Sequence, residues 1–258
     1  MINAAITKKI AARITLAGCI PHASHRLLLI VSLPSIVPST PRIGPRNPPG
    51  VRAPVYERPD GSSMIEVMEE EIRPGRLLVA TPLLEEPSFR RSVVFVVDHG
   101  PEEGTLGVVL NRPTEVPVGQ ILPPWADLVS GLDVVFHGGP VALDSALALA
   151  HARGTDEPFG WRSLDGLPAV ARVGLVDLDS PPSLIADGID RLRVFAGYAG
   201  WAAGQLRTEI EEGSWYVVSA ELNDIFAEAP ERLWQRVLRR QGGDLAFVST
   251  YPDDPTLN

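Results

Sequence analysis

The chain has 258 residues, of which 45% are hydrophobic and 6% aromatic, enough to bury the core of one or two domains. Its one cysteine, Cys19, excludes a disulfide framework or a cysteine-based zinc site within one chain, and this is typical of a reducing compartment, so we expect a cytoplasmic protein. The formal net charge is −9. The sequence contains no run of about 18 apolar residues, so no membrane-spanning helix is predicted.

Charge divides the chain into two parts. Residues 1–58 hold eight of the 23 basic residues and only one, Glu57, of the 32 acidic residues, so the rest of the chain is strongly acidic. Such a field repels phosphate backbones, and we therefore expect no direct binding of nucleic acid. Both lysines, Lys8 and Lys9, also lie in the first part, which excludes a P-loop lysine, a Schiff-base lysine and a lysine general base downstream.

Residues 1–63 are predicted to form a disordered or linker-like extension, because they contain nine of the 25 prolines and show no sustained period. An alternative is an export signal in which Cys19, at the end of "LAGC", is acylated, although Arg13 interrupts the apolar stretch. A third possibility is that the natural start lies later, since Met64 and Met68 stand directly before the first regular segment.

From Arg76 onward, short β-branched runs are bounded by Pro, Gly and Asp, which is the pattern of buried strands. "HGPEEG" between the second and third runs predicts a hairpin loop. "ALALAH" alternates with a period of two, which favours a strand over a helix. The predicted strands are 76–80, 92–99, 105–113, 133–139, 146–151, 173–178, 192–198, 214–220 and 245–249.

Three helices carry start or stop signals. The strongest prediction is 230–243, where an apolar stripe repeats at helical spacing, two arginines occupy the last turn and Gly242 supplies the stop. A second helix is predicted over 179–188, with Ser180 as its N-cap and a proline in its first turn. A third is expected to begin near Gly204 and to run through "QLRTEIEEG".

Six short motifs stand out in this downstream part: "FRRSVVFVVDH" (89–99), "GTLGVVLNRP" (104–113), "GGPV" (138–141), "GYAGWAAGQL" (197–206), "GSWYV" (213–217) and "LNDIF" (222–226). In order and spacing they resemble the AlgH/YqgE family of bacterial proteins, over residues 75–258. The resemblance implies an α+β (α/β-like) fold with a mixed, curled β-sheet approaching a pseudo-barrel and a few flanking helices. Residues 64–258 are accordingly expected to form a single globular domain.

The resemblance implies no settled activity, although some members of the family carry a transcription-regulator label. We expect a non-enzymatic protein that binds a small ligand or a partner, affects transcription only indirectly and uses no cofactor or metal. The alternative is a hydrolase or transferase that uses His99 and the glycine-rich corner 197–206. A serine nucleophile such as Ser92 would need an imidazole within hydrogen-bond reach, and no G-x-S-x-G, H-E-x-x-H or G-x-G-x-x-G motif is present.

One position departs from the family pattern. Many relatives place a histidine directly after the residue that corresponds to Leu149, whereas here Ala150 follows and His151 comes one position later. In a strand this shift puts the imidazole on the opposite face, so a function that rests on a histidine there is not carried over. The histidines His99, His137 and His151 are also too few and too scattered to predict a metal site.

The stretch "FAGYAGWAAGQL" contains three glycines, a tryptophan and a glutamine but no reactive group, which indicates recognition rather than catalysis. The corner from Gly200 to Gly204 is expected to expose N–H groups at a helix start, with Trp201 as an apolar wall for a small anionic or planar ligand. The competing interpretation is that Trp201 fills the core. No catalytic residue is assigned, and the candidate ligand-binding residues are His99, Asn111, Arg112, Gly138, Gly139, Tyr198, Gly200, Trp201, Gly204 and Gln205.

Overall fold

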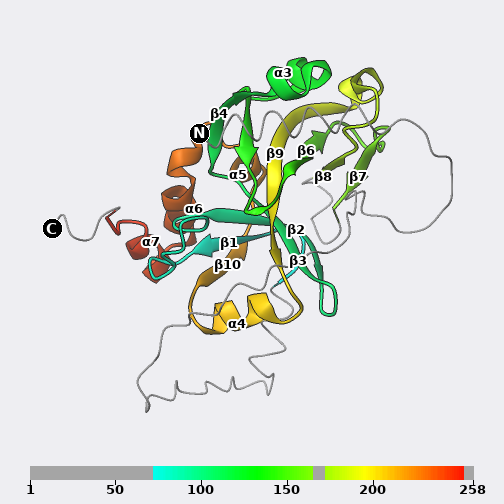
Figure 1. Ribbon diagram of the computed structural model, residues 1–258. Helices are drawn as coiled ribbons and strands as arrows, with labels where there is room; N and C mark the ends of the chain where they lie inside the picture. The colour runs from blue at the N-terminus through cyan, green and yellow to red at the C-terminus, as the bar shows by residue number, and fades with distance from the viewer. Residues whose placement is uncertain (1–71, 165–171, 253–258) are drawn as a thin grey trace, which may run out of the picture.

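The structure is a computed structural model that describes residues 72–164 and 172–252 (Figure 1). The predicted extension 1–63, with Cys19 and its alternative as an export signal, lies outside the described residues. Within the two described ranges, no helix is both long and apolar enough to cross a membrane.

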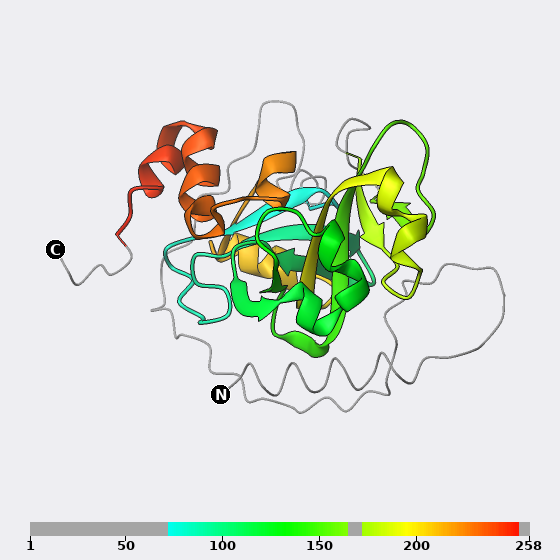
Figure 2. The ribbon, with the colours of Figure 1, turned by 90° about the horizontal axis from the view of Figure 1, so that it is seen from above.

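The described residues build one mixed sheet, curled around the long strand β9, and a few helices flank it (Figures 1 and 2). The strand order is β10-β1-β2-β3-β9-β6-β8-β7, and β5 lies parallel to β9 while β4 pairs with β5. This arrangement confirms the α+β class. The strands are β1 Arg76–Ala80, β2 Val93–Gly100, β3 Gly104–Val109, β4 Pro113–Pro117, β5 Val134–His137, β6 Val141–Ala152, β7 Trp161–Ser163, β8 Val173–Val176, β9 Ile189–Trp201 and β10 Trp215–Ser219.

The helices of the described residues are short, and four of them are 3₁₀ turns. Two predicted helices are confirmed: α6 lies within 230–243, and α4 follows Gly204. Figures 1 and 2 place α6 and α7 on one side of the molecule and strands β6 to β8 on the other. The helices are α3 Val118–Ile121, α4 Gln205–Glu211, α5 Leu222–Ile225, α6 Leu233–Gln241 and α7 Gly243–Val248, with 3₁₀ turns η1 Pro123–Leu128, η3 Pro182–Leu184, η4 Ala186–Gly188 and η5 Pro230–Arg232.

The predicted strands up to 214–220 are confirmed within a few residues, because these apolar runs are buried on both faces of the sheet. In β1, Leu77 and Val79 point to one cluster of buried side chains, while Leu78 and Ala80 point to another. The predicted hairpin loop is confirmed as well, since β2 and β3 are antiparallel neighbours.

The strand predicted over 245–249 is wrong, because residues 245–248 belong to α7 and Ser249 is its C-cap. Leu245 and Val248, three residues apart, both pack against the largest core cluster, and this spacing fits one face of a helix. Phe247 lies on the other side and is 81% exposed.

The helix predicted over 179–188 is also corrected, because the segment forms the two 3₁₀ turns η3 and η4. Two prolines in succession remove backbone donors, and a single large apolar side chain, Ile185, is buried along the segment. Ser180 does not cap a helix, since its hydroxyl donates to Oδ2 of Asp177 at 2.9 Å.

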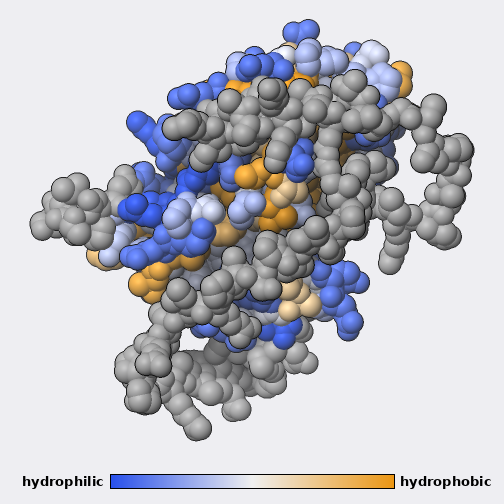
Figure 3. All heavy atoms as spheres, in the orientation of Figure 1, coloured by the Kyte–Doolittle hydropathy of each residue, from blue (hydrophilic) through white to orange (hydrophobic). Residues whose placement is uncertain are grey.

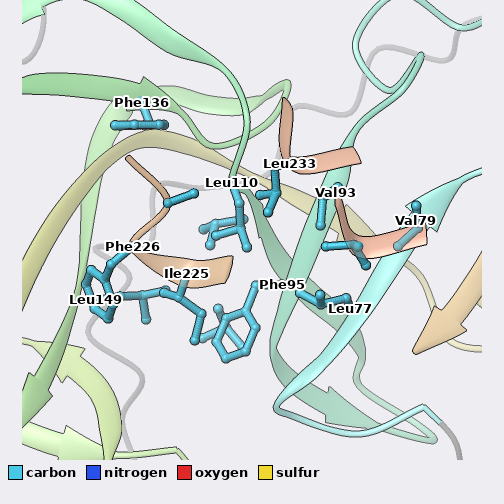
Figure 4. Close-up of a cluster of buried hydrophobic side chains, with 14 of the residues drawn as sticks. Leu77, Val79, Val93, Phe95, Leu110, Phe136, Leu149, Ile225, Phe226 and Leu233 are labelled. Carbon is cyan, nitrogen blue, oxygen red and sulfur yellow. The ribbon is translucent and has the colours of Figure 1, made fainter. Parts of the chain in front are cut away.

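The largest core cluster lies between the sheet and helices α5 and α6 (Figure 4). One charged residue, Arg193 of β9, lies beside this cluster and is only 1% exposed. The Arg193 guanidinium donates to the carbonyls of Ile225 (2.9 Å) and Ala227 (2.8 Å) and lies over the ring of Phe136 at 4.2 Å. Burial lowers the pKa of Arg193 to about 10, so the group stays charged at neutral pH and ties α5 to β9.

Candidate functional site

The ten candidate residues lie at three places in the fold. Asn111 and Arg112 lie between β3 and β4, and Gly138, Gly139 and Tyr198 lie where the segment after β5 meets β9. The other five gather around the last residues of β2 and β9 and the start of α4; they are His99, Gly200, Trp201, Gly204 and Gln205.

Asn111 and Arg112 bind the backbone of the turn before β2. The buried Asn111 donates from Nδ2 to the carbonyl of Arg91 at 2.8 Å and accepts the N–H of Val93 at 2.9 Å. The Arg112 guanidinium donates to the carbonyl of Arg90, and burial lowers the pKa of Arg112. These polar groups are used within the fold, and their ligand role stays a prediction.

Gly138 and Gly139 permit the close approach of two backbones. A Cβ on Gly138 would lie 2.3 Å from the carbonyl oxygen of Gly197, and one on Gly139 would lie 2.2 Å from the carbonyl carbon of Tyr198. Gly139 also has a φ of +152°, a backbone conformation that residues with a side chain rarely adopt. The glycines therefore set the spacing between β5 and β9, and their ligand role likewise stays a prediction.

A small notch forms where the β2–β3 hairpin meets the corner between β9 and α4, and we name it the hairpin–corner notch. Pairing of Thr105 with Trp201 in the β3–β9 ladder brings the hairpin beside the corner. The notch has a volume of about 10 Å³, room for roughly one water-sized group. Its lining residues are Ile72, His99, Gly100, Pro101, Gly104, Thr105, Ala202, Gly204, Leu206 and Arg207.

Gly104 makes this juxtaposition possible. Its φ is +95°, and a Cβ at this position would lie 2.2 Å from the carbonyl oxygen of Trp201. Because both the conformation and the contact exclude a side chain, the hairpin can lie against the end of β9 only with glycine here.

His99 contributes the notch's titratable ring. Its Nδ1 lies 2.8 Å from Oγ1 of the buried Thr105. Partial burial lowers the pKa of His99, and the carboxylate of Asp98 opposes this shift without reversing it. The imidazole is therefore mainly neutral at neutral pH, with one ring nitrogen a donor and the other an acceptor.

The ring of Trp201 lies in an aromatic cluster and is not open to solvent. Trp201 is 5% exposed, and its ring stacks on Phe89 at 5.8 Å and meets Trp215 edge-on at 5.8 Å. The indole N–H groups of Trp201 and Trp215 both donate to Oε2 of Glu209, each at 2.9 Å. The apolar wall expected from Trp201 is thus covered by its neighbours.

The glycine corner is closed by Gln205. Its Oε1 accepts the N–H of Ala202 at 3.1 Å, and its Nε2 donates to Oε1 of Glu209 at 2.9 Å. Gly204 is the N-cap of α4 with a φ of 74°, and Gly200 is paired with β3. Of the five candidates gathered here, the structure brings His99 and Gly204 into the notch and places the other three beside it.

The prediction from sequence missed Thr105 and Glu209. Counting outward from the hairpin loop pairs Thr105 with His99, so the contact could have been found from the hairpin itself. Glu209 lies four residues after Gln205 on the predicted helix, a spacing that brings the two side chains together. Nothing in the sequence indicates that two indoles share the Glu209 carboxylate.

The serine–histidine pair considered for an enzyme is not formed. Ser92 and His99 are separated by seven residues at opposite ends of β2, which is on the order of 20 Å. The Ser92 hydroxyl is buried and has no hydrogen-bond partner among the described residues. The same residues contain no group of three or more His, Cys, Asp and Glu that could hold a metal ion.

The two other histidines of the described chain lie away from the notch lining. His151 is at the end of β6, where Nδ1 lies 2.6 Å from Oδ1 of Asp190. The preceding Ala150 is fully buried in a different cluster from Leu149, as expected for alternating faces of a strand.

Burial lowers the pKa of His137, with a smaller contribution from the charge of Arg112.

Together these features define a small α+β protein with a curled mixed sheet and a narrow notch beside its central strand. The sequence model of the family described as AlgH-like matches residues 77–246. A UPF0301 protein of Thermobifida fusca is 59% identical over 187 residues, covering 71% of this chain and 94% of the relative. A UPF0301 protein of Streptomyces coelicolor is 58% identical over 188 residues, with the same two shares covered. The chain belongs to the AlgH/YqgE family.

Two solved structures share the fold. The crystal structure of protein DIP2367 from Corynebacterium diphtheriae has a TM-score of 0.64 and 32% identity, covering 70% of this chain and 93% of that one. The solution structure of AlgH from Pseudomonas aeruginosa has a TM-score of 0.50 and 23% identity, covering 70% and 94%. The latter likeness concerns the fold alone.

Proposed function

We propose that the protein is a non-enzymatic regulatory protein that holds the tip of a small ligand, or a side chain of a partner, in the hairpin–corner notch. The observation that carries this proposal is the His99–Thr105 pair, 2.8 Å apart, placed directly beside the glycine corner. A neutral imidazole offers one donor and one acceptor. Because the notch admits roughly one water-sized group, it suits a carboxylate or amide end rather than a whole metabolite.

The proposed setting is the cytoplasm, and the proposed effect on transcription is indirect. The single cysteine supports the first point, and the acidic charge of the chain supports the second, since it disfavours contact with DNA.

A thermal-shift screen of the full chain against metabolites and short peptides tests the proposal. A ligand at 100 times its Kd stabilises the fold by about 2.7 kcal/mol, which is readily measured. We expect hits to lose this stabilisation in His99→Gln and in Thr105→Val, and to keep it in the control His151→Gln. Hits that stabilise all three variants equally would place the binding site elsewhere.

A second candidate function, a hydrolase or transferase, is favoured by one observation. The hydroxyl of Thr105 lies against the imidazole of His99, as a nucleophile lies against its base. In a substrate screen this function requires Thr105→Ser to retain activity and His99→Gln to lose about 10² to 10⁴ in rate. An activity that survives His99→Gln within about tenfold excludes a general base at this position.

A further inference from the structure

Helix α6 has one apolar face and one face formed by arginine. The buried face packs into the largest core cluster, and the residues of the opposite face are polar or charged. Figure 3 shows many hydrophilic residues on the described surface on the side where Figure 1 draws α6 and α7. The outward residues recur at the three- and four-residue spacing of one helical face. They line a hollow in the surface together with Ala229, and we call them the arginine face: Arg232, Gln235, Arg236, Arg239 and Arg240.

Part of this charge is neutralised by one buried carboxylate. Asp224 of α5, with its side chain 1% exposed, accepts hydrogen bonds from Arg240 at 2.8 and 3.0 Å. Arg236 lies 3.4 Å from the same side chain and donates to the carbonyl of Asn223 at 2.8 Å. Arg240 also pairs with Glu221 at 3.1 Å. These contacts hold two of the guanidinium groups in fixed positions at the rim of α5.

The other two arginines of the face have no such partner. The side chains of Arg232 and Arg239 are exposed, and no carboxylate of the described residues lies within salt-bridge distance of either. Arg191 of β9 extends the basic surface, since it donates to Oδ1 of Asn223 at 2.9 Å, next to Arg236. Two uncompensated guanidinium groups therefore stand beside a preorganised pair, on a chain that is acidic downstream of its first segment.

We propose that the arginine face docks a short acidic segment of a partner protein. The planar guanidinium fork matches the two oxygens of a carboxylate, and arginine is enriched at protein interfaces. A helix of nine residues is about 14 Å long, which fits a few acidic side chains. A nucleic acid would extend beyond the face onto the acidic remainder of the chain, which disfavours it. This docking surface does not depend on the function proposed for the notch.

The test uses the full chain and a fluorescein-labelled peptide of eight glutamates, with binding followed by fluorescence anisotropy at low salt. The variant R232Q/R239Q removes the two uncompensated charges. The matched control R153Q/R162Q removes two other exposed arginines and changes the net charge by the same amount. We expect binding to weaken about tenfold in R232Q/R239Q and to stay within about twofold in the control, because only close charge pairs are strongly coupled.

Three results would overturn the proposal. The first is that the peptide does not bind, and the second is that both double variants weaken binding equally, which would report net charge alone. The third is that a single-stranded octanucleotide binds the same face more tightly than the peptide, which would assign the face to nucleic acid. Unchanged thermal midpoints of both double variants establish that they are folded.

Discussion

The indole N–H of Trp201 donates to Oε2 of Glu209 at 2.9 Å, and this bond joins the last residue of β9 to helix α4. Trp215 of β10 donates to the same oxygen at the same distance. One carboxylate thus satisfies two largely buried donors that belong to different strands of the sheet. The glycine-rich corner is therefore built around Glu209, and the notch next to it opens on the side of the hairpin.

Replacing Trp201 with alanine is expected to cost about 3 to 5 kcal/mol of unfolding free energy, because it empties a site that Phe89 and Trp215 enclose. Urea denaturation measures the change. The exposed Gln205 serves as the control, and Gln205→Ala is expected to cost about 1 kcal/mol, as for loss of a hydrogen bond. If Trp201→Ala costs no more than the control, the ring is a pocket wall and not part of the core.

Glu209→Ala is expected to destabilise the protein by about 2 kcal/mol, because it leaves the indole donors of Trp201 and Trp215 without their acceptor. Glu209→Gln keeps one side-chain carbonyl oxygen and is expected to cost less than half as much. Chemical denaturation of the two variants makes the comparison. Equal losses in both would mean that the negative charge, rather than the acceptor, holds the corner together.

Much of the sheet was predictable because its strands are buried on both faces. Runs such as the one containing Leu77 and Leu78 carry an apolar signal at every position, and their flanking turn residues mark the ends. The same signal failed at Leu245, where a short apolar run is compatible with either a strand or a helix. The run forms helix α7 because its apolar side chains pack against the largest core cluster. This tertiary contact cannot be predicted from the local sequence.

The site was predictable only where local geometry determines it. A hairpin loop fixes which residues face each other, so the contact of His99 with Thr105 follows from the register. The buried Arg193 could not be predicted, because its partners are backbone carbonyls and an aromatic ring from distant segments. The arginine face could be predicted only in part. The apolar stripe on the other side of the helix was predicted, whereas the hydrogen bond between Arg240 and Asp224 depends on tertiary structure.

Gly104→Ala is expected to destabilise the protein strongly and to disturb the notch, because the new Cβ would lie 2.2 Å from the carbonyl oxygen of Trp201. Gly131→Ala is a matched control. Its φ of +74° imposes a similar conformational strain, of about 1 to 2 kcal/mol, but no atom lies within 4 Å of the added Cβ. Thermal melts of the two variants separate the backbone strain from the collision of the new Cβ. Equal losses of melting temperature would contradict the close approach of Gly104 to Trp201.

His99 is expected to make the protein less stable in mild acid. Burial lowers the pKa of His99 below its ordinary value of 6.5, so between these two values the unfolded chain binds more protons than the folded one. The stabilising contribution of the neutral ring is fully present above 6.5 and is lost as the pH falls through the folded-state pKa. Replacing His99 with glutamine removes this contribution, so the free energy of unfolding should fall less in acid.

Urea titrations of wild type and His99→Gln at about pH 7.5 and about pH 5.5 measure this difference across the histidine range. The variant is still expected to lose some unfolding free energy in acid, because burial also lowers the pKa of His137. The double variant His99→Gln/His137→Gln should show a still smaller loss between the two pH values. Acid sensitivity identical in wild type and His99→Gln would show that the ring is solvated in solution. The partly buried position of the ring beside Thr105 would then be wrong, and the ligand chemistry proposed for the notch would have to be revised.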